Sequence, residues 1–327
     1  MLRLPRVRHL RPETAAQAAA LVAEHPAGKA MLVAGGTDVV PNLKRRQFET
    51  ELLVQVPDQG GIRRSGGHFE LGATVTLAAA SEHEELKAAL PGYAEAAGLV
   101  SSPPLRNAGT VGGNLCVDTR CNYYNQTYEW RKSIGFCMKR DGDICLVAPG
   151  SPRCWAVSSS DTAPMAIALG ATAVLTGPDG GEREVSVADL YRDDGIEYLA
   201  KRPEEVLTSI RLPYRLGLES AYVKLRRRGS IDFPIAGAAV ALQREAGTIT
   251  DARICLSAVG SHPVDATAAA ERLKGERLTD ELIAEVADLA AKPAKPLDNA
   301  DLTHFWRKRM VRLVVEKALR SATAARG

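Results

Sequence analysis

Four cysteines lie close together near the middle of the sequence, and their side chains are well suited to chemistry. They are Cys121, Cys137, Cys145 and Cys154, separated by 15, 7 and 8 residues, and the other two cysteines are Cys116 and Cys255. In a reducing compartment, clustered thiols act mainly as metal ligands or redox groups. Because glycine-rich and hydroxyl-rich segments flank the cluster, the sequence predicts a metal centre beside a bound cofactor. Such an arrangement is typical of electron transfer.

The cysteine spacing fits few common metal sites. Structural zinc sites usually pair their cysteines two to four residues apart, and no such pair occurs within the set of four. Four residues separate Cys116 from Cys121, as in the first cysteine pair of a plant-type [2Fe–2S] site. Tyr124, however, occupies the position where that site requires its next cysteine. Zinc and free redox-active thiols stay open as alternatives. We expect Cys116 to be a packed side chain, or a substitute ligand, and Cys255 to lie in the core.

Two Gly-Gly segments could hold a phosphate. The first glycine segment is Val33-Ala-Gly-Gly-Thr-Asp38, and the second is Gly109-Thr-Val-Gly-Gly-Asn114, about 75 residues later. Paired glycines let the backbone approach a ligand, and free N–H groups can hold a diphosphate. Neither segment matches a Rossmann fingerprint or a P-loop. The two segments could hold one diphosphate together, or they could be two unrelated turns.

Composition limits the class of protein. The chain has 327 residues, 45% of them apolar, enough for two or three domains. Its net charge is only +3, with 42 basic and 39 acidic residues, so no nucleic-acid partner is indicated. No apolar stretch is long enough to cross a membrane, and the first residues lack the apolar core of a secretion signal. We therefore expect a cytoplasmic protein.

Apolar periodicity predicts three units, residues 1–57, 58–218 and 219–327. The predicted strands are 6–10, 30–34, 52–56, 68–71, 171–176, 221–226, 236–243 and 253–259. The predicted helices are 13–24, with a capping box at Thr14 and Gln17, and 162–169, 263–273, 279–291 and 302–318, with others opening at Thr76 and ending at Gly98. In the last helix, Leu302, Trp306, Met310, Leu313 and Val314 are expected to form the buried face.

Residues 115–156, here called the cysteine-rich segment, show no steady helical or strand period. Six of the sixteen aromatic residues lie in or next to this segment: Tyr123, Tyr124, Tyr128, Trp130, Phe136 and Trp155. Disordered segments are poor in aromatic residues. We therefore predict an ordered insertion with a function of its own.

Three ordered motifs carry a resemblance to a known family. They are Val33-Ala-Gly-Gly-Thr-Asp38, Asn107-Ala-Gly-Thr-Val-Gly-Gly-Asn-Leu115 and Ser159-Ser-Asp161 before a helix with Pro164. Together they resemble the FAD-binding subunit of molybdenum hydroxylases, the family of xanthine dehydrogenase. Residues 219–327 resemble its C-terminal domain through Tyr222-x-Lys224, Asp232 and Ala258-Val-Gly260. The resemblance implies an α+β protein, with the two-subdomain FAD-binding fold of the vanillyl-alcohol oxidase type and a C-terminal flavoprotein domain.

The same resemblance implies bound, non-covalent FAD and assigns residues to it. The implied FAD-binding residues are Met31, Leu32, Val33, Ala34, Gly35, Gly36, Thr37, Asp38, Thr110, Val111, Gly112, Gly113, Asn114, Ser160, Asp161 and Lys224. Asn114 and Asp161 would hold the ribityl chain or the ring edge. Lys224 would approach the isoalloxazine, or would be a surface lysine on a strand.

The cysteine-rich segment departs from most of the family, which closes this loop in a few residues. Its four-cysteine spacing resembles the [4Fe–4S] loop of one branch, the β subunit of 4-hydroxybenzoyl-CoA reductase. This implies a cubane bound by Cys121, Cys137, Cys145 and Cys154. It also implies reductive removal of a ring hydroxyl from an aromatic CoA thioester, with electrons from a ferredoxin-type donor.

The implied partners are a large molybdenum-cofactor subunit and a small [2Fe–2S] subunit, in a dimer of heterotrimers. Two other functions stay open. One is the FAD subunit of a molybdenum hydroxylase that oxidises an aldehyde or an N-heterocycle. The other is a structural zinc protein that binds no flavin.

Overall fold

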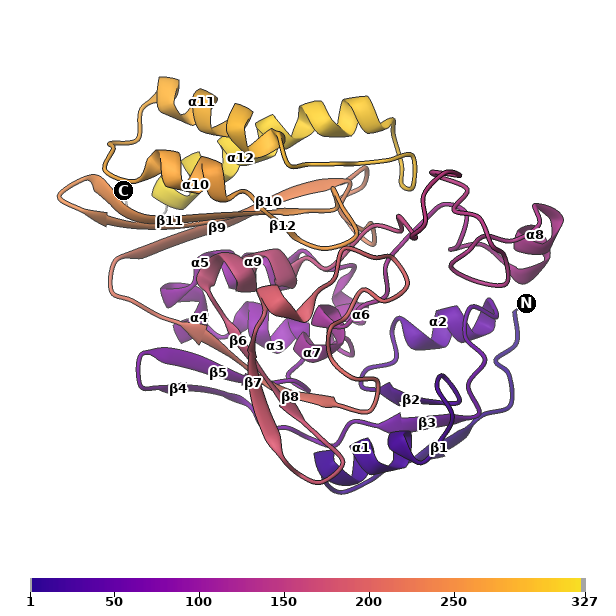
Figure 1. Cartoon of the computed structure of the whole chain (residues 1–327). Coiled ribbons are helices and arrows are strands. Elements are labelled where there is room, and N and C mark those ends of the chain that lie inside the picture. The colour runs from indigo at the N-terminus through magenta and orange to yellow at the C-terminus, as the bar shows by residue number, and fades with distance from the viewer. Residues whose placement is uncertain (1, 325–327) are drawn as a thin grey trace.

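Three β-sheets and the helices that cover them give the chain an α+β architecture, which the computed structural model describes over residues 2–324 (Figure 1). The predicted fold class is therefore confirmed. Two of the sheets lie on opposite sides of a layer of helices, and the third, smaller sheet lies beside them (Figure 1).

The smallest sheet is parallel and contains the N-terminal strands. Its order is β1 (Arg8–Leu10), β3 (Leu52–Gln55) and β2 (Ala30–Val33). Helix α1 (Ala15–Ala23) packs on this sheet, and the predicted capping box between Thr14 and Gln17 starts the helix. A short helix that was not predicted, α2 (Val39–Lys44), follows the first glycine segment.

The second sheet is antiparallel. Its order is β4 (Ile62–Ser65), β5 (His68–Gly72), β8 (Val206–Pro213), β6 (Thr172–Thr176) and β7 (Glu182–Ser186). The helices near it are α3 (Leu77–Glu82), α4 (Glu84–Ala89), α5 (Pro91–Gly98), α6 (Pro103–Arg106), α7 (Val111–Leu115) and α9 (Thr162–Leu169). All residues of α9 are buried, because this helix lies in the middle layer between two sheets.

The third sheet is also antiparallel. Its order is β12 (Val264–Asp265), β11 (Thr248–Ser257), β10 (Ala236–Glu245) and β9 (Leu218–Leu225). Its outer face is covered by α10 (Thr267–Leu273), α11 (Asp280–Ala291) and α12 (His304–Ala324). The opposite face contributes Tyr222, Ala239 and Cys255 to the core around α9.

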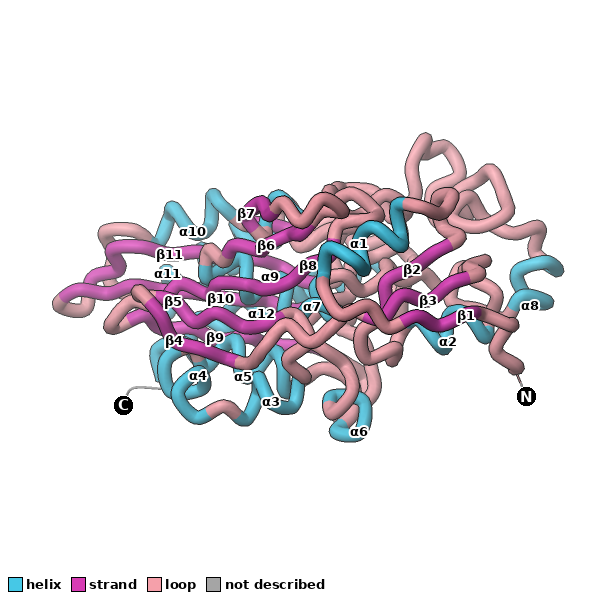
Figure 2. Tube along the Cα trace, turned by 90° about the horizontal axis from the view of Figure 1, so that it is seen from below, coloured by secondary structure: helices cyan, strands magenta, loops and turns pink. Residues whose placement is uncertain are grey.

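The cysteine-rich segment is irregular but folded, as its aromatic residues predict. It contains one helix, α8 (Tyr128–Ser133), and otherwise consists of turns and loops at one end of the molecule (Figure 2). Tyr124 is buried together with three of the cysteines in a small core of its own. Among residues 2–324, no helix is long and apolar enough to cross a membrane.

Two predictions in the last unit are wrong in detail. Residues 264–265 form strand β12, so helix α10 begins later than predicted, at Thr267. Helix α12 begins at His304, so Leu302 precedes it; Leu302 and Leu313 are 46% and 48% exposed, and Val314 is the only predicted face residue that is fully buried. The buried residues are instead Arg307, Val311, Val314, Val315, Ala318, Leu319 and Ala322.

A buried arginine explains the different helix face. The Arg307 guanidinium donates hydrogen bonds to the carbonyl groups of Ile235, Leu297 and Ala258 and to the side chain of Asn299. These bonds satisfy a charged group in the core, where it would otherwise be costly. Apolar periodicity counts arginine as a polar residue, so it predicted a buried face that lies beside the true one.

Candidate flavin cleft and cysteine site

The two glycine segments meet in the structure. At Gly35, a Cβ atom would lie 1.8 Å from the carbonyl oxygen of Ala108, so any side chain would collide with the backbone that leads into the second segment. Gly36 has a φ of +69°, a conformation that glycine adopts without strain. Glycine is therefore needed at both positions for different reasons.

The first glycine segment has the free donors. The backbone N–H groups of residues 35–38 donate to no protein acceptor within the described part of the chain. They precede the first turn of α2, whose N–H groups at Val40 and Asn42 are paired with the carbonyl groups of Gly36 and Asp38, so the free donors are those of residues 35–38. This cluster of donors is suited to a phosphate group.

The second glycine segment forms the start of a helix. Thr110 caps α7, and its Oγ1 accepts a hydrogen bond of 3.0 Å from the N–H of Gly113. The N–H groups of Val111 and Gly112 donate to the carbonyl groups of Val75 and Ala73. Because these donors are paired within the protein, this segment forms a wall and offers few free amides to a diphosphate.

A continuous cleft runs past both segments. It consists of two cavities, of about 370 and 200 Å³, whose shared lining residues are Leu32, Ala34, Asp38, Val39, Gly113 and Cys116. We call these two cavities the flavin cleft. Eleven of the predicted FAD residues line it, namely Met31, Leu32, Ala34, Gly35, Gly36, Thr37, Asp38, Thr110, Gly112, Gly113 and Asn114.

Five predicted residues do not line this cleft: Val33, Val111, Ser160, Asp161 and Lys224. Val33 and Val111 are buried in the core, because strand and helix direct them away from the cavity. The cleft is also lined by residues that no motif indicated, among them Asp118, Tyr198, Lys201 and Phe233. These residues come from irregular loops, so their place in the cleft depends on the tertiary fold.

The Asn114 side chain links the second glycine segment to Ser160 and Thr162 at the start of α9. Its Oδ1 accepts hydrogen bonds from Ser160 Oγ at 2.8 Å, Thr162 Oγ1 at 2.7 Å and the backbone N–H of Thr162 at 3.1 Å. This carbonyl oxygen is therefore fully used by the protein. Asn114 positions the start of α9 against the cleft wall.

Asp161 and Lys224 form a buried ion pair behind the cleft. Lys224 Nζ donates to Asp161 Oδ2 at 2.8 Å, and the Tyr222 hydroxyl donates to Oδ1 at 2.8 Å. The two charged side chains are 1% and 3% exposed. Burial raises the pKa of Asp161 and lowers the pKa of Lys224, and the charge of each partner opposes the other's shift. The pair joins the third sheet to α9.

All four cysteines of the cluster line one small cavity. Their thiols are free, and their residues are between 4% and 8% exposed. The cavity holds about 10 Å³, and Tyr123, Tyr124, Met138, Lys139, Leu146, Val147 and Ala156 complete its walls. Within residues 2–324, no group of three His, Cys, Asp or Glu side chains is placed to hold a single metal ion. The thiols thus converge on one cavity without converging on one point.

Burial favours the neutral form of two of these thiols. It raises the pKa of Cys121 to about 12 and the pKa of Cys154 to about 11. The N–H of Ala156 lies 3.4 Å from the sulfur of Cys154. Cys255 is fully buried in the core, as predicted, whereas Cys116 is half-buried on the wall of the flavin cleft.

Lys139 connects the thiol cavity to the flavin cleft. Its Nζ donates to Asp118 Oδ1 at 2.7 Å, to Thr119 Oγ1 at 2.5 Å and to the carbonyl of Gly195 at 2.6 Å. It also lies 4.7 Å from the centroid of the Tyr124 ring. Lys139 lines the thiol cavity, and Asp118 lines the flavin cleft.

A second connection runs through Arg120, the residue before Cys121. Its guanidinium pairs with Asp38 of the first glycine segment and lies 4.5 Å from the centroid of the Phe233 ring. Further along, Arg131 donates to the carbonyl groups of Arg45 and Arg46 after α2. The cysteine-rich segment is therefore fixed to the elements that form the flavin cleft.

Comparison with known proteins agrees with this architecture. The family model described as "FAD binding domain in molybdopterin dehydrogenase" matches residues 5–215, and that of the "CO dehydrogenase flavoprotein C-terminal domain" matches residues 220–322. The carbon monoxide dehydrogenase medium chain of Afipia carboxidovorans is 30% identical over 96% of each chain. The aldehyde oxidoreductase FAD-binding subunit PaoB of Escherichia coli is 29% identical, over 77% of this chain and 81% of that one.

A solved structure of carbon monoxide dehydrogenase from Hydrogenophaga pseudoflava superimposes with a TM-score of 0.80 at 28% identity, covering 98% of this chain and 99% of that one. This agreement confirms the predicted two-part flavoprotein fold over nearly its full length. The chain therefore belongs to the family of FAD-binding subunits of molybdenum hydroxylases.

Proposed function

We propose that this chain is the flavin and iron–sulfur subunit of a molybdenum enzyme similar to 4-hydroxybenzoyl-CoA reductase. Such an enzyme removes a ring hydroxyl from an aromatic CoA thioester with electrons from a ferredoxin-type donor. The observation that carries the proposal is the set of four buried cysteines on one cavity beside the flavin cleft. Their position would let an external electron donor reach the flavin through a second redox centre.

FAD would occupy the flavin cleft, with its diphosphate at the free N–H groups of residues 35–38. Bound FAD would supply the redox group that accepts electrons and passes them on. Asp118 offers a buried carboxylate oxygen, Oδ2, that has no partner within the described residues. Because Asp118 lines the cleft, this oxygen could accept a hydrogen bond from the cofactor.

Cys121, Cys137, Cys145 and Cys154 would bind a [4Fe–4S] cluster, which transfers one electron at a time. The donor set fits, since four thiolates are the usual ligands of this cluster. Zinc requires four ligands around one ion at about 2.3 Å from each sulfur, whereas each thiolate of a cubane binds its own iron atom. The four thiols share a cavity without meeting at a point, so a zinc ion would also require them to move.

The space between the thiols is small. A cavity of about 10 Å³ holds no more than one water molecule. Binding a cluster therefore requires the surrounding loops to move apart. These loops are irregular and lie outside the three sheets, so such a movement would leave the sheets in place.

The proposed partners are a large molybdenum-cofactor subunit, where the ring chemistry would occur, and a small [2Fe–2S] subunit. We propose a dimer of heterotrimers. Support comes from the names of similar proteins, which are a medium chain and a FAD-binding subunit, and from the match to nearly their whole length.

A second candidate is the FAD subunit of a molybdenum hydroxylase that oxidises an aldehyde or an N-heterocycle. The names of the similar proteins favour it, because they include carbon monoxide dehydrogenase and aldehyde oxidoreductase. The alternative of a zinc protein without flavin is not retained, because the FAD-binding family model matches residues 5–215.

Activity of the assembled complex separates the two candidates. The complex should be purified without oxygen and supplied with 4-hydroxybenzoyl-CoA and a low-potential electron donor, and benzoyl-CoA formation should be measured. A parallel assay should supply an aldehyde and an artificial electron acceptor. Dehydroxylation without aldehyde oxidation supports the reductase. Aldehyde oxidation alone would replace the reductase proposal with the second candidate.

A further inference from the structure

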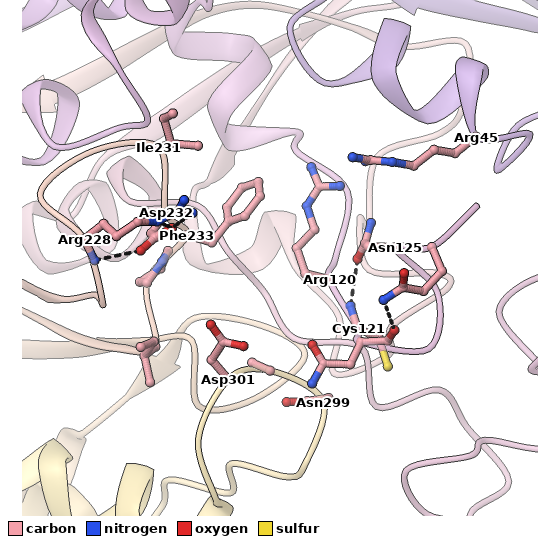
Figure 3. A pocket seen from close by; sticks show the side chains of 15 residues that line it. Arg45, Arg120, Cys121, Asn125, Arg228, Ile231, Asp232, Phe233, Asn299 and Asp301 are labelled. Carbon is pink, nitrogen blue, oxygen red and sulfur yellow. Dashed lines mark hydrogen bonds and ion pairs between the residues drawn. The ribbon is translucent and has the colours of Figure 1, made fainter. Parts of the chain in front are cut away.

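A separate cavity of about 340 Å³ lies between the start of the cysteine-rich segment, residues 228–235 and residues 299–301 (Figure 3). It shares Phe233 with the flavin cleft and Cys121 with the thiol cavity, and no other lining residue with either. Pockets that bind small molecules usually have volumes of about 300 Å³ or more. The cavity is thus large enough for a small organic ligand and is distinct from both proposed redox sites.

Two residues that line this cavity have a buried hydrogen-bond donor without an acceptor among the described residues. Arg120 Nε and Asn125 Nδ2 are buried and have no acceptor within residues 2–324. By contrast, the two carboxylates at the cavity are paired, Asp232 with Arg228 and Asp301 with Arg227. A buried donor without an acceptor is costly, so this pattern fits a ligand rich in acceptor atoms.

The charges at the cavity indicate the same kind of ligand. Figure 3 shows the guanidinium groups of Arg45 and Arg120 pointing toward one another. Asp38 pairs with Arg120, whereas Arg45 has no carboxylate within ion-pair distance among the described residues. Two cations that face one another repel unless an anion lies near both. Guanidinium groups are also the preferred partners of phosphate and carboxylate.

Part of the cavity is apolar. Phe233 and Ile231 are 48% and 56% exposed, although both are large hydrophobic residues. The Phe233 ring already stacks on the guanidinium of Arg120, and both residues line the cavity. This surface could cover a flat or apolar group next to the anionic one.

We propose that this cavity binds a small organic oxyanion, with a phosphate or carboxylate group held by Arg45, Arg120 and Asn125 and an apolar body against Phe233. The site is additional to FAD and to the cysteine cluster, although Cys121 contributes to its lining. Because Arg120 also pairs with Asp38, only the Arg120 side chain would separate the ligand from the first glycine segment.

Calorimetric titration of the purified complex tests this site, with inorganic phosphate and benzoate as separate probes. Arg45→Gln removes one cation from the cavity, and Arg46→Gln makes the same charge change on the exposed neighbouring residue, which does not line the cavity. Asn125→Asp replaces the unpaired donor by an acceptor and keeps Oδ1, which accepts the N–H of Cys121 at 2.9 Å.

We expect one molecule of at least one probe to bind per chain. Binding should weaken at least tenfold in Arg45→Gln and in Asn125→Asp and should stay unchanged in Arg46→Gln. Phosphate binding alone would identify a phosphate ligand, and benzoate binding alone would identify a carboxylate ligand with an apolar body. Absence of binding by both probes at millimolar concentrations would overturn the proposal. So would equal affinity in all variants, or equal loss in Arg45→Gln and Arg46→Gln.

Discussion

Lys139 and Asp118 form an ion pair of 2.7 Å that separates the thiol cavity from the flavin cleft. Their side chains are only 6% and 8% exposed. Lys139 belongs to the segment with the cysteines, and Asp118 lines the cavity proposed for FAD. The two sites therefore share a charged wall, and a substitution of either residue should alter both sites.

The first prediction concerns this wall. Lys139→Met should destabilise the protein by about 3 kcal/mol, because it leaves the buried Asp118 carboxylate without its cation. Chemical unfolding of the complex measures the effect. Lys132→Met, on the exposed face of α8, is the matched control and should cost little.

A double-mutant cycle identifies the ion pair as the cause. Asp118→Asn combined with Lys139→Met should cost less than the sum of the two single changes. Strict additivity would show that the two side chains do not interact, which would contradict the described wall.

The second prediction concerns the glycine contact. Gly35→Ala should yield protein with little FAD, because the new Cβ would lie 1.8 Å from the Ala108 carbonyl oxygen and would push the two glycine segments apart. Gly61→Ala is the control, since no atom lies within 4 Å of its added Cβ. Flavin absorbance after purification measures the content. Equal flavin content in both variants would show that the close contact between Gly35 and Ala108 is not needed for FAD binding.

The third prediction is a pH dependence. A hydrogen bond from Arg183 is the main cause that lowers the pKa of Glu205 to about 2 from a usual value of 4.5. A carboxyl group with a lowered pKa in the folded state stabilises the protein above pH 4.5, and this contribution is lost as the pH falls toward 2. Glu205→Gln should therefore cost about 2 kcal/mol at pH 7.

The difference between Glu205→Gln and the natural protein should shrink when unfolding is measured at successively lower pH below 4.5. Glu197→Gln, at an exposed side chain, should show no such trend. A difference that stays constant from pH 7 to pH 3 would contradict the assignment.

Much of the fold could be predicted because local patterns decide it. The capping box at Thr14 and the strands that flank the glycine segments depend on neighbouring residues. The buried face of α12 could not be predicted, because it depends on distant carbonyl groups that accept from Arg307.

Some residues of the candidate site could be predicted from the sequence, and others could not. Gly35 and Gly36 carry their own signal, since paired glycines mark a close approach of the backbone. Asp118, Tyr198 and Phe233 carry none, since loops far apart in the sequence bring them to the cleft. Asp161 and Lys224 were assigned to FAD from motifs, and the structure shows their side chains paired with each other.

The most direct test of the central proposal is the metal and flavin content of six cysteine-to-serine variants purified without oxygen. Replacement of Cys121, Cys137, Cys145 or Cys154 should remove close to four iron atoms per chain, or leave a three-iron species, because a cubane needs four thiolates. The flavin should be largely retained, because these residues lie outside the flavin cleft.

Cys116→Ser and Cys255→Ser are the internal controls and should keep their full iron content, since neither residue lines the thiol cavity. Iron, sulfide and flavin are measured together in all six variants and in the natural protein. If a [4Fe–4S] cluster occupies the thiol cavity, iron and sulfide will be present in the natural protein and lost in the four cavity variants only. Zinc in place of iron, or loss of iron in Cys116→Ser with retention in Cys121→Ser, would contradict this assignment.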